Sequence, residues 1–154
     1  MAASVRALAV TLAAVSGEPW AFGGESLHIV ERPLTDTISH VSSKPDAMGD
    51  SMAFANPVYD ATNTRHIGTA QGSCVRVIVG KSWECTFTII ISNDRIALAG
   101  SYNDTGDSVF AVTGGTGRYA GAKGAMTVRV RDPKLLPNGE ASAYDMIVDF
   151  ADHS

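Results

Sequence analysis

The sequence predicts an all-β fold, a closed up-and-down barrel of eight antiparallel strands. Apolar and polar residues alternate along several short runs, which is typical of half-buried strands. Glycine, asparagine and aspartate separate these runs, as turns require. No connection after residue 50 is long enough for a crossover helix, so consecutive strands are expected to pair antiparallel. Closure would remove the exposed edges of such a sheet.

The first half of the chain contains four of the expected strands. Residues 26–31 form a short run that ends in a carboxylate, and residues 52–59 form a second run that contains Pro57. Residues 66–79 are a long run that a Gly-Lys-Ser turn closes. Residues 83–91 show the clearest alternation, because aromatic, cysteine and isoleucine side chains occupy every second position.

The second half of the chain contains the other four expected strands. Residues 96–102 are rich in small side chains, and residues 109–113 form a short apolar run. The glycine-rich residues 114–124 that follow are expected to form a tight turn, since glycine accepts positive φ angles. Residues 125–131 and 143–150 each alternate apolar with polar or charged side chains.

Two segments are expected to lie outside these strands. Residues 32–49 are polar and contain two prolines, so they are interpreted as a long connection. Residues 1–25 form a separate N-terminal segment, which suits either a short secretory signal or an extra strand, and residues 26–154 form the barrel domain. A secreted or periplasmic location and a cytoplasmic one are equally open from this pattern.

The composition limits the partners of the chain. Its 154 residues suggest one domain, and the net charge of −4 without a run of basic residues argues against nucleic acid. The N-terminal apolar stretch is shorter than the ~20 residues that span a membrane, so no membrane partner is expected. Cys74 and Cys85 lie in neighbouring expected strands, where two buried thiols are the preferred interpretation and a disulfide is the alternative.

Several common catalytic motifs are absent from the sequence. The four histidines lack the spacing of a metal site, and no GxSxG motif of a serine hydrolase occurs. The Gly-Gly-Thr-Gly-Arg-Tyr segment at residues 114–119 lacks the Gly-Lys-Ser/Thr ending of a phosphate-binding loop. These three kinds of site are therefore not expected from the motifs of the sequence.

The segment at residues 109–121, Val-Phe-Ala-Val-Thr-Gly-Gly-Thr-Gly-Arg-Tyr-Ala-Gly, resembles the strand–glycine-turn–strand signature of allene oxide cyclases and dirigent proteins. Three further stretches match the cyclases in the same order, namely residues 48–56, residues 68–74, and the pair Trp83-Glu84 followed by Gly100-Ser101-Tyr102. The resemblance covers about residues 26–130 and implies a lipocalin-like barrel that binds a small molecule.

The resemblance implies roles for individual residues. Glu31 would stabilise positive charge on a substrate cation, Asn56 would hold a water against the substrate oxygen, and Cys74 would line the pocket. Phe54, Trp83 and Tyr102 would form apolar walls. A surface carboxylate, a structural amide, a packed thiol and ordinary core packing are the respective alternatives.

The sequence also departs from the cyclases. Pro33 stands where they have an asparagine, so the water-holding set is incomplete unless Ser39 replaces part of it. Arg76 lies two residues after Cys74, and an inward Arg76 would pair with Glu31 across the cavity. This pair would make the pocket more polar than that of the plant cyclases, which argues against the plant fatty-acid epoxide as substrate.

Three functions are compatible with these residues. The first is a cofactor-free isomerase or cyclase that closes a ring in a small hydrophobic substrate of oxylipin or polyketide type. The second is a dirigent-like, non-catalytic protein that orients intermediates, with Asp104, Asp107 and Arg118 as its polar residues. The third is a small-ligand carrier. A homo-oligomer, dimer or trimer, is expected, with Ile90 and Ile147 suited to its interface.

Overall fold

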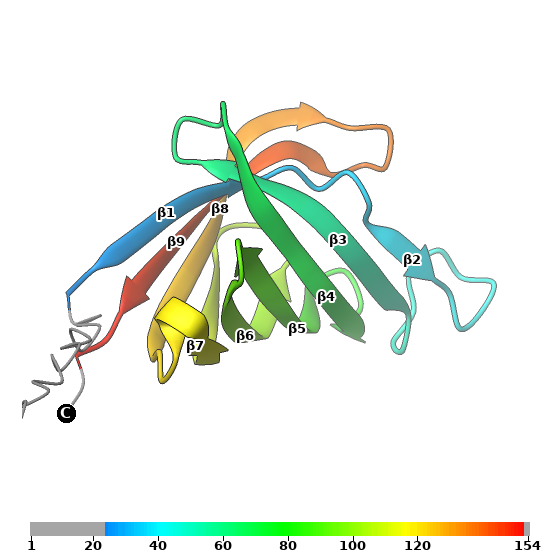
Figure 1. The fold of residues 1–154 in the computed structure, drawn as a ribbon. Coiled ribbons are helices and arrows are strands. Elements are labelled where there is room, and N and C mark those ends of the chain that lie inside the picture. Colours follow the sequence, from blue (N-terminus) through cyan, green and yellow to red (C-terminus); the bar gives the residue numbers. More distant parts are fainter. Residues whose placement is uncertain (1–23, 153–154) are drawn as a thin grey trace, which may run out of the picture.

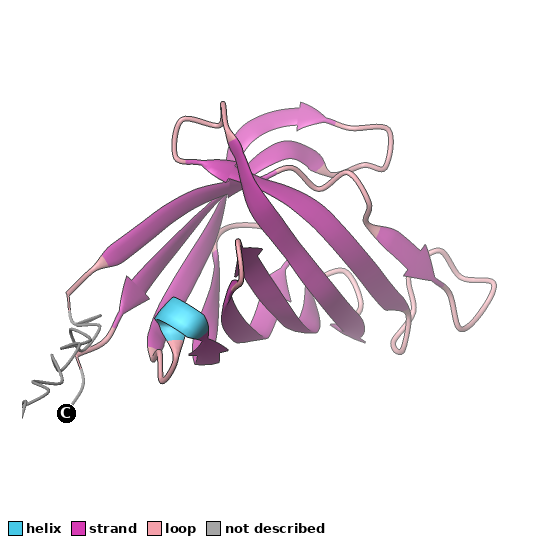
Figure 2. Ribbon diagram, viewed as in Figure 1, coloured by secondary structure: helices cyan, strands magenta, loops and turns pink. Residues whose placement is uncertain are grey.

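Antiparallel pairing joins nine strands in the computed structural model, which describes residues 24–152, in the order β1-β9-β8-β7-β6-β5-β4-β3-β2 (Figure 1). A further pairing of β1 with β3 closes the sheet. Among the described residues the single helix is the 3-10 turn η1 (Gly117–Tyr119), as Figure 2 shows. The strands are β1 (Ser26–Glu31), β2 (Thr37–Ser39), β3 (Ser51–Asp60), β4 (His66–Ile78), β5 (Ser82–Ile91), β6 (Asp94–Asn103), β7 (Ser108–Thr116), β8 (Gly124–Leu135) and β9 (Ala141–Phe150).

The predicted closed barrel of eight antiparallel strands is confirmed, because β1 and β3 to β9 form the ring. The short strand β2 pairs with the first residues of β3, on the same edge of β3 that β1 occupies further along. It lies within residues 32–49, which the sequence predicted to be a connection without strands. All three residues of β2 are exposed, so no alternation of apolar and polar residues marked it as a strand.

An interruption in strand pairing separates β1 from β2 along β3. Residues 51–53 of β3 pair with β2, and residues 58–60 pair with β1. Between them the carbonyl of Pro57 accepts a hydrogen bond from the Arg32 N–H at 3.2 Å. The N–H and C=O of one residue point to the same side of an antiparallel strand, so the missing N–H of Pro57 faces this interruption. The proline therefore costs the ladder little, and β3 continues through it.

The disulfide between Cys74 and Cys85 joins β4 to β5. The two cysteines are direct cross-strand partners, with Cα atoms 4.0 Å apart. The preferred interpretation of two reduced thiols is therefore wrong. A register shift between Arg76 and Ile78 sets which residues of the hairpin face each other, and the alternation pattern does not reveal such a shift.

Close packing between β4 and β5 depends on a glycine. Gly72 is the cross-strand partner of Phe87, and a Cβ at position 72 would overlap the Thr86 carbonyl and the Phe87 backbone. Phe87 in turn contacts Phe54 and Phe110 edge to face, with ring centroids 5.8 and 5.0 Å away. The glycine thus makes room for an aromatic cluster inside the barrel.

Two expectations lie at the margins of the described fold. The signal or extra strand expected in residues 1–25 falls outside residues 24–152, apart from the last two positions. Within that range no helix has the length and apolar character of a membrane span. Ile90 and Ile147 are half-buried, and the expected dimer or trimer stays a prediction.

Reducing the disulfide should destabilise the barrel. Cys74 and Cys85 are 11 positions apart, and a cross-link that closes a loop of this length stabilises a fold by about 3 kcal/mol. Urea unfolding of the oxidised and the phosphine-reduced protein measures the difference. The double variant Cys74→Ala/Cys85→Ala is the control, since the phosphine should leave its stability unchanged; equal stabilities of the oxidised and reduced native protein would contradict the expectation.

Candidate active site in the barrel cavity

A cavity inside the barrel encloses about 480 Å³ of empty space, the open solvent at its mouth included. Its wall comes from β1, β3 to β9 and the connections after β1 and β8. The lining residues are Glu31, Pro33, Asp36, Met52, Phe54, Asn56, Cys74, Cys85, Phe87, Tyr102, Phe110, Val128, Glu140, Tyr144 and Met146. Barrels of eight strands typically have room for one small ligand, so this cavity is the candidate site.

One part of the cavity wall is apolar. It contains the cluster of Phe54, Phe87 and Phe110, the Cys74–Cys85 disulfide and the side chains Met52, Val128 and Met146. These residues come from strands whose inward positions alternate with exposed ones, as in β5 and β7. This apolar part suits the hydrocarbon or ring portion of a ligand.

Glu31 is the last residue of β1, and Arg32 and Pro33 follow it in the connection to β2. Its side chain is buried, and its Oε1 accepts a hydrogen bond from Asn56 Nδ2 at 3.0 Å. Asn56 belongs to β3 and is 1% exposed, so the bond joins two neighbouring strands beneath the interrupted pairing. The structure therefore brings the two residues expected to carry catalysis together at the cavity wall.

Burial raises the pKa of the Glu31 carboxyl to about 8. The hydrogen bond from Asn56 lowers this pKa, whereas the negative charges of Asp36 and Glu140 raise it. At pH 7 the carboxyl is therefore mainly protonated. A buried carboxyl with a pKa near neutrality can give and take a proton, which is the requirement for a general acid or base.

The Asn56 side chain uses all of its hydrogen-bonding capacity within the protein. Nδ2 donates to Glu31 and also to Asp36 Oδ1 at 2.7 Å, while Oδ1 accepts from the Thr35 N–H and Thr35 Oγ1, both at 2.9 Å. The backbone N–H of Thr35 is a donor only, so it fixes which end of the amide carries oxygen. The expected role of Asn56, holding a water against the substrate, does not fit this arrangement. Asn56 instead positions two carboxyl groups.

A second polar group on the cavity wall consists of two tyrosines and a carboxylate. Tyr102 on β6 donates to the Tyr144 hydroxyl at 3.1 Å, and Tyr144 on β9 donates to Glu140 Oε2 at 2.9 Å. Burial raises the pKa of Tyr102 and raises that of Tyr144 to about 12, so both remain phenols at neutral pH. Burial also raises the pKa of Glu140, against the lowering effect of the Tyr144 hydroxyl.

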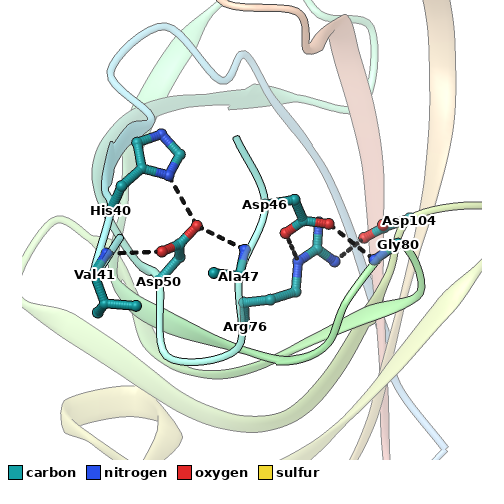
Figure 3. A network of polar contacts seen from close by, with 8 residues as sticks. All are labelled: His40, Val41, Asp46, Ala47, Asp50, Arg76, Gly80 and Asp104. Atoms are coloured by element: carbon teal, nitrogen blue, oxygen red, sulfur yellow. Dashed lines mark hydrogen bonds and ion pairs between the residues drawn. The ribbon is translucent and has the colours of Figure 1, made fainter. Parts of the chain in front are cut away.

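Arg76 does not pair with Glu31, and the predicted contact across the cavity is wrong. Arg76 Nε lies 2.7 Å from Asp46 Oδ1, and its Nη1 lies 2.6 Å from Asp104 Oδ1 (Figure 3). Its guanidinium stacks 4.3 Å from the centroid of the Trp83 ring. Arg76 and Trp83 are buried, yet neither is among the residues that line the cavity. Both aspartates follow strand ends in loops, so the sequence pattern gave no sign of this ion pair.

The connection between β2 and β3 is ordered by this arginine and by a buried aspartate. Asp50 accepts hydrogen bonds from the Val41 N–H at 2.9 Å, the Ala47 N–H at 3.1 Å and His40 Nδ1 at 2.8 Å (Figure 3). These contacts, the Val41 N–H first, hold the pKa of Asp50 below its usual range. Asp46 also accepts a hydrogen bond from the Gly80 N–H at 2.9 Å. The connection is thereby tied to the start of β3 and the end of β4.

The remaining expected residues divide into two groups. Phe54, Cys74 and Tyr102 line the cavity, as does Pro33, whereas Ser39 is exposed on β2. The three residues proposed for a dirigent-like pocket, Asp104, Asp107 and Arg118, do not line it.

Asp36, Glu140 and Tyr144 line the cavity without having been singled out from the sequence. Tyr144 could have been found, because it shares the inward face of its strand with Met146. Asp36 and Glu140 lie in connections, where a carboxylate normally faces solvent. In the described part of the chain, no set of three or more histidine, cysteine, aspartate or glutamate side chains is placed to hold a metal ion.

Comparison with known proteins identifies the family. The allene oxide cyclase family model matches residues 30–133. The chain belongs to the allene oxide cyclase family. The matched region includes most of the barrel, with Glu31, Asn56 and Tyr102 among the cavity residues that it covers, while Glu140 and Tyr144 lie beyond it.

Solved structures similar to this family member share its barrel. A pyocyanin demethylase has a TM-score of 0.69 at 20% identity, over 82% of this chain and 100% of its own. The pterocarpan synthase dirigent protein PsPTS1 has a TM-score of 0.68 at 14% identity, over 84% of this chain and 96% of its own. The Diels–Alderase AbmU from Streptomyces koyangensis has a TM-score of 0.59 at 14% identity, over 88% and 70%. At these identities the likeness establishes the fold.

The raised pKa of Glu31 should make the stability of the protein fall as pH rises. The folded protein retains a proton on Glu31 that the unfolded chain releases near pH 4.5. The contribution of Glu31 to stability is therefore fully present below pH 4.5 and is lost as the pH rises to about 8. Glu31→Gln cannot ionise and should remove on the order of 4 kcal/mol of this loss. Urea unfolding at pH 5 and pH 8 measures the effect.

Glu84→Gln is the matched control for that measurement. Glu84 lies on β5 facing solvent, and its Oε2 accepts a hydrogen bond from Ser101 Oγ. This variant should retain the dependence on pH of the native protein. An equal dependence in Glu31→Gln would show that Glu31 titrates normally in the folded state.

Proposed function

We propose that this protein is a ring-closing isomerase whose own side chains supply the proton chemistry inside the barrel cavity. The observation that carries the proposal is Glu31, a buried carboxyl on the wall of a partly aromatic cavity with its pKa raised to about 8. Membership of the allene oxide cyclase family supports the same class of reaction. A Diels–Alderase with the same fold is a further ring-forming relative.

The apolar part of the cavity would select the reactive conformer of the substrate. A flexible chain held against Phe54, Phe87 and Phe110 brings its two reacting carbons together, which removes entropy before the bond forms. The enclosed site also excludes bulk water from a reactive intermediate. These effects require shape and apolar contact, and the aromatic cluster provides both.

Glu31 would act as a general acid. In its neutral form the carboxyl donates its proton to an oxygen of the substrate while the carbon–oxygen bond of a strained or activated ring breaks. The resulting carboxylate lies beside the delocalised carbocation and stabilises it until the new carbon–carbon bond forms. The hydroxyl of the closed ring then returns its proton to Glu31 as the ketone forms. The step is an isomerisation, with no net gain or loss of atoms, protons or electrons.

In this role Glu31 is neutral before the reaction begins, whereas a fixed negative charge would already be ionised when the substrate binds. The family resemblance implies an ionised Glu31, whereas burial keeps the carboxyl mainly neutral at pH 7. The negative charge would arise only on proton transfer, when the substrate becomes positive. Asn56 would be a positioning residue, because it holds Glu31 Oε1 and leaves Oε2 for the substrate.

A stereochemical assay tests ring closure. An allene oxide is generated in place from a fatty-acid methyl ester hydroperoxide, and chiral chromatography measures the enantiomers of the cyclopentenone. We expect one enantiomer in excess, and we expect Glu31→Gln to lose about 100-fold or more in rate, as general acids typically contribute. The native rate should fall as pH rises through about 8, because Glu31 then ionises.

Three variants separate positioning and chemistry in that assay. Glu84→Gln should behave as the native protein does. Asn56→Leu should shift the upper limb of the pH–rate profile, since Asn56 lowers the Glu31 pKa, and Asn56→Gln should restore part of the rate. A racemic product formed at the background rate would reject ring closure and favour the dirigent-like alternative, a protein that binds and orients without turnover.

A further inference from the structure

The carboxyl groups of the cavity each have one oxygen held and one oxygen available. Asn56 holds Glu31 Oε1 and Asp36 Oδ1, and Tyr144 holds Glu140 Oε2. We find no hydrogen bond to the second oxygen of any of these carboxyls within residues 24–152, and because no fully buried side-chain oxygen there lacks a partner, these oxygens are open to the cavity. Polar atoms in a cavity are costly without a partner, so three acceptor atoms are available to a ligand.

No positively charged side chain balances these carboxyl groups. The lining contains three carboxyls and, among the described residues, no lysine, arginine or histidine. Arg76 is bound by Asp46 and Asp104, and Arg32 donates to Asn63 and stacks on Tyr59. Buried carboxylates in proteins are usually paired with a cation, and this cavity lacks one of its own.

The aromatic cluster adds a second attraction for positive charge. The faces of Phe54, Phe87 and Phe110 carry the negative part of the ring quadrupole, and rings within about 6 Å of a cation attract it. The Phe87 ring contacts the rings of Phe54 and Phe110 edge to face, so the cluster offers differently oriented surfaces to one ligand. Carboxyl oxygens and aromatic faces together are the usual surroundings of a bound onium group.

We propose that the substrate of this cavity carries a cationic nitrogen, which binds between Asp36 and Glu140 while its apolar part lies against the phenylalanines and Glu31 keeps its proton as the acid. The inference rests on the proposed function, because it names the substrate class of the same site. A substrate that ends in a free carboxylate is disfavoured, since it would meet the carboxyls of Asp36 and Glu140 without a countercharge. This distinguishes the cavity from one that receives an unesterified fatty acid.

Binding of such a cation is coupled to the ionisation of the cavity. The groups that face Glu31 are Asp36 from the β1–β2 connection, Asn56 from β3, Tyr102 from β6, Glu140 from the β8–β9 connection and Tyr144 from β9. The two phenols stay neutral at neutral pH, and burial raises the pKa values of Asp36 and Glu140, so these carboxyls are the groups that a bound cation would ionise. A bound cation favours their ionised forms and should release protons.

Three ligands that share one apolar body test the proposal by calorimetry. They are 4-phenylbutyl-trimethylammonium, a permanent cation, 5-phenylpentanamide, a neutral molecule, and 5-phenylpentanoate, an anion. We expect the cation to bind at least about tenfold more tightly than the amide at pH 8, and the carboxylate to bind most weakly. The affinity of the cation should rise with pH as Asp36 and Glu140 ionise, whereas the amide should show no such rise.

Variants assign the preference to the cavity. Glu140→Gln and Asp36→Asn should each reduce the affinity for the cation several-fold, while Glu84→Gln should not. An unchanged affinity for the amide shows that a variant has kept its cavity, so loss of folding is recognised directly. Equal affinities for the cation and the carboxylate, or a cation preference that survives in Glu140→Gln/Asp36→Asn, would overturn the proposal. Because these ligands do not react, the result is independent of whether the protein closes rings.

Discussion

The amide of Asn56 is the contact on which the polar part of the site depends. Two carboxyl groups that would repel each other when ionised lie on its two N–H donors, and Thr35 occupies its oxygen. An amide is suited to this place because it donates twice without carrying charge. A lysine or arginine there would pair with the carboxylates and lower their pKa values, which would abolish proton transfer near neutral pH. The neutral donor holds the geometry and leaves the pKa of Glu31 high.

The barrel keeps this acidic region separate from its charged surroundings. Arg76 is buried close to the site. Its cross-strand partner is Trp83, and Trp83 is in turn the cross-strand partner of Tyr102, which lines the cavity. Asp46 and Asp104 hold the guanidinium away from Glu31, and Trp83 covers its face. The ordered β2–β3 connection therefore has an electrostatic consequence besides a structural one. Asp46 from this connection and Asp104 from the β6–β7 connection satisfy the buried arginine with carboxylates that are not part of the cavity.

The sequence was sufficient for the barrel and for part of its cavity. Alternation located all eight strands of the ring, and the family resemblance selected Glu31, Asn56, Phe54, Cys74 and Tyr102, which do line the cavity. Prediction from the sequence failed for residues whose contacts come from loops that are distant along the chain. Arg76 and Glu31 are both buried, but Arg76 pairs with two aspartates from loops. Glu140 and Asp36 reach the cavity from connections, and periodicity carries no information about where a loop carboxylate points.

The disulfide was missed for a related reason. Direct opposition of Cys74 and Cys85 depends on a register shift near the hairpin turn, and one residue of slip would have placed them on different faces. Disulfides persist mainly in oxidising compartments, but whether residues 1–25 are a secretory signal stays a prediction, because the described residues begin at 24. The sequence alone left that segment open between two interpretations.

The interruption between β1 and β2 has a consequence for how this barrel can diversify. Residues 32–36 leave the ladder there, and they deliver Pro33 and Asp36 to the cavity without belonging to any strand. Insertions or deletions in this one connection would change the chemistry of the cavity and leave every strand register intact. A scaffold with such a replaceable segment in its wall can acquire new substrates through small local changes, while the closed ring continues to supply the stability.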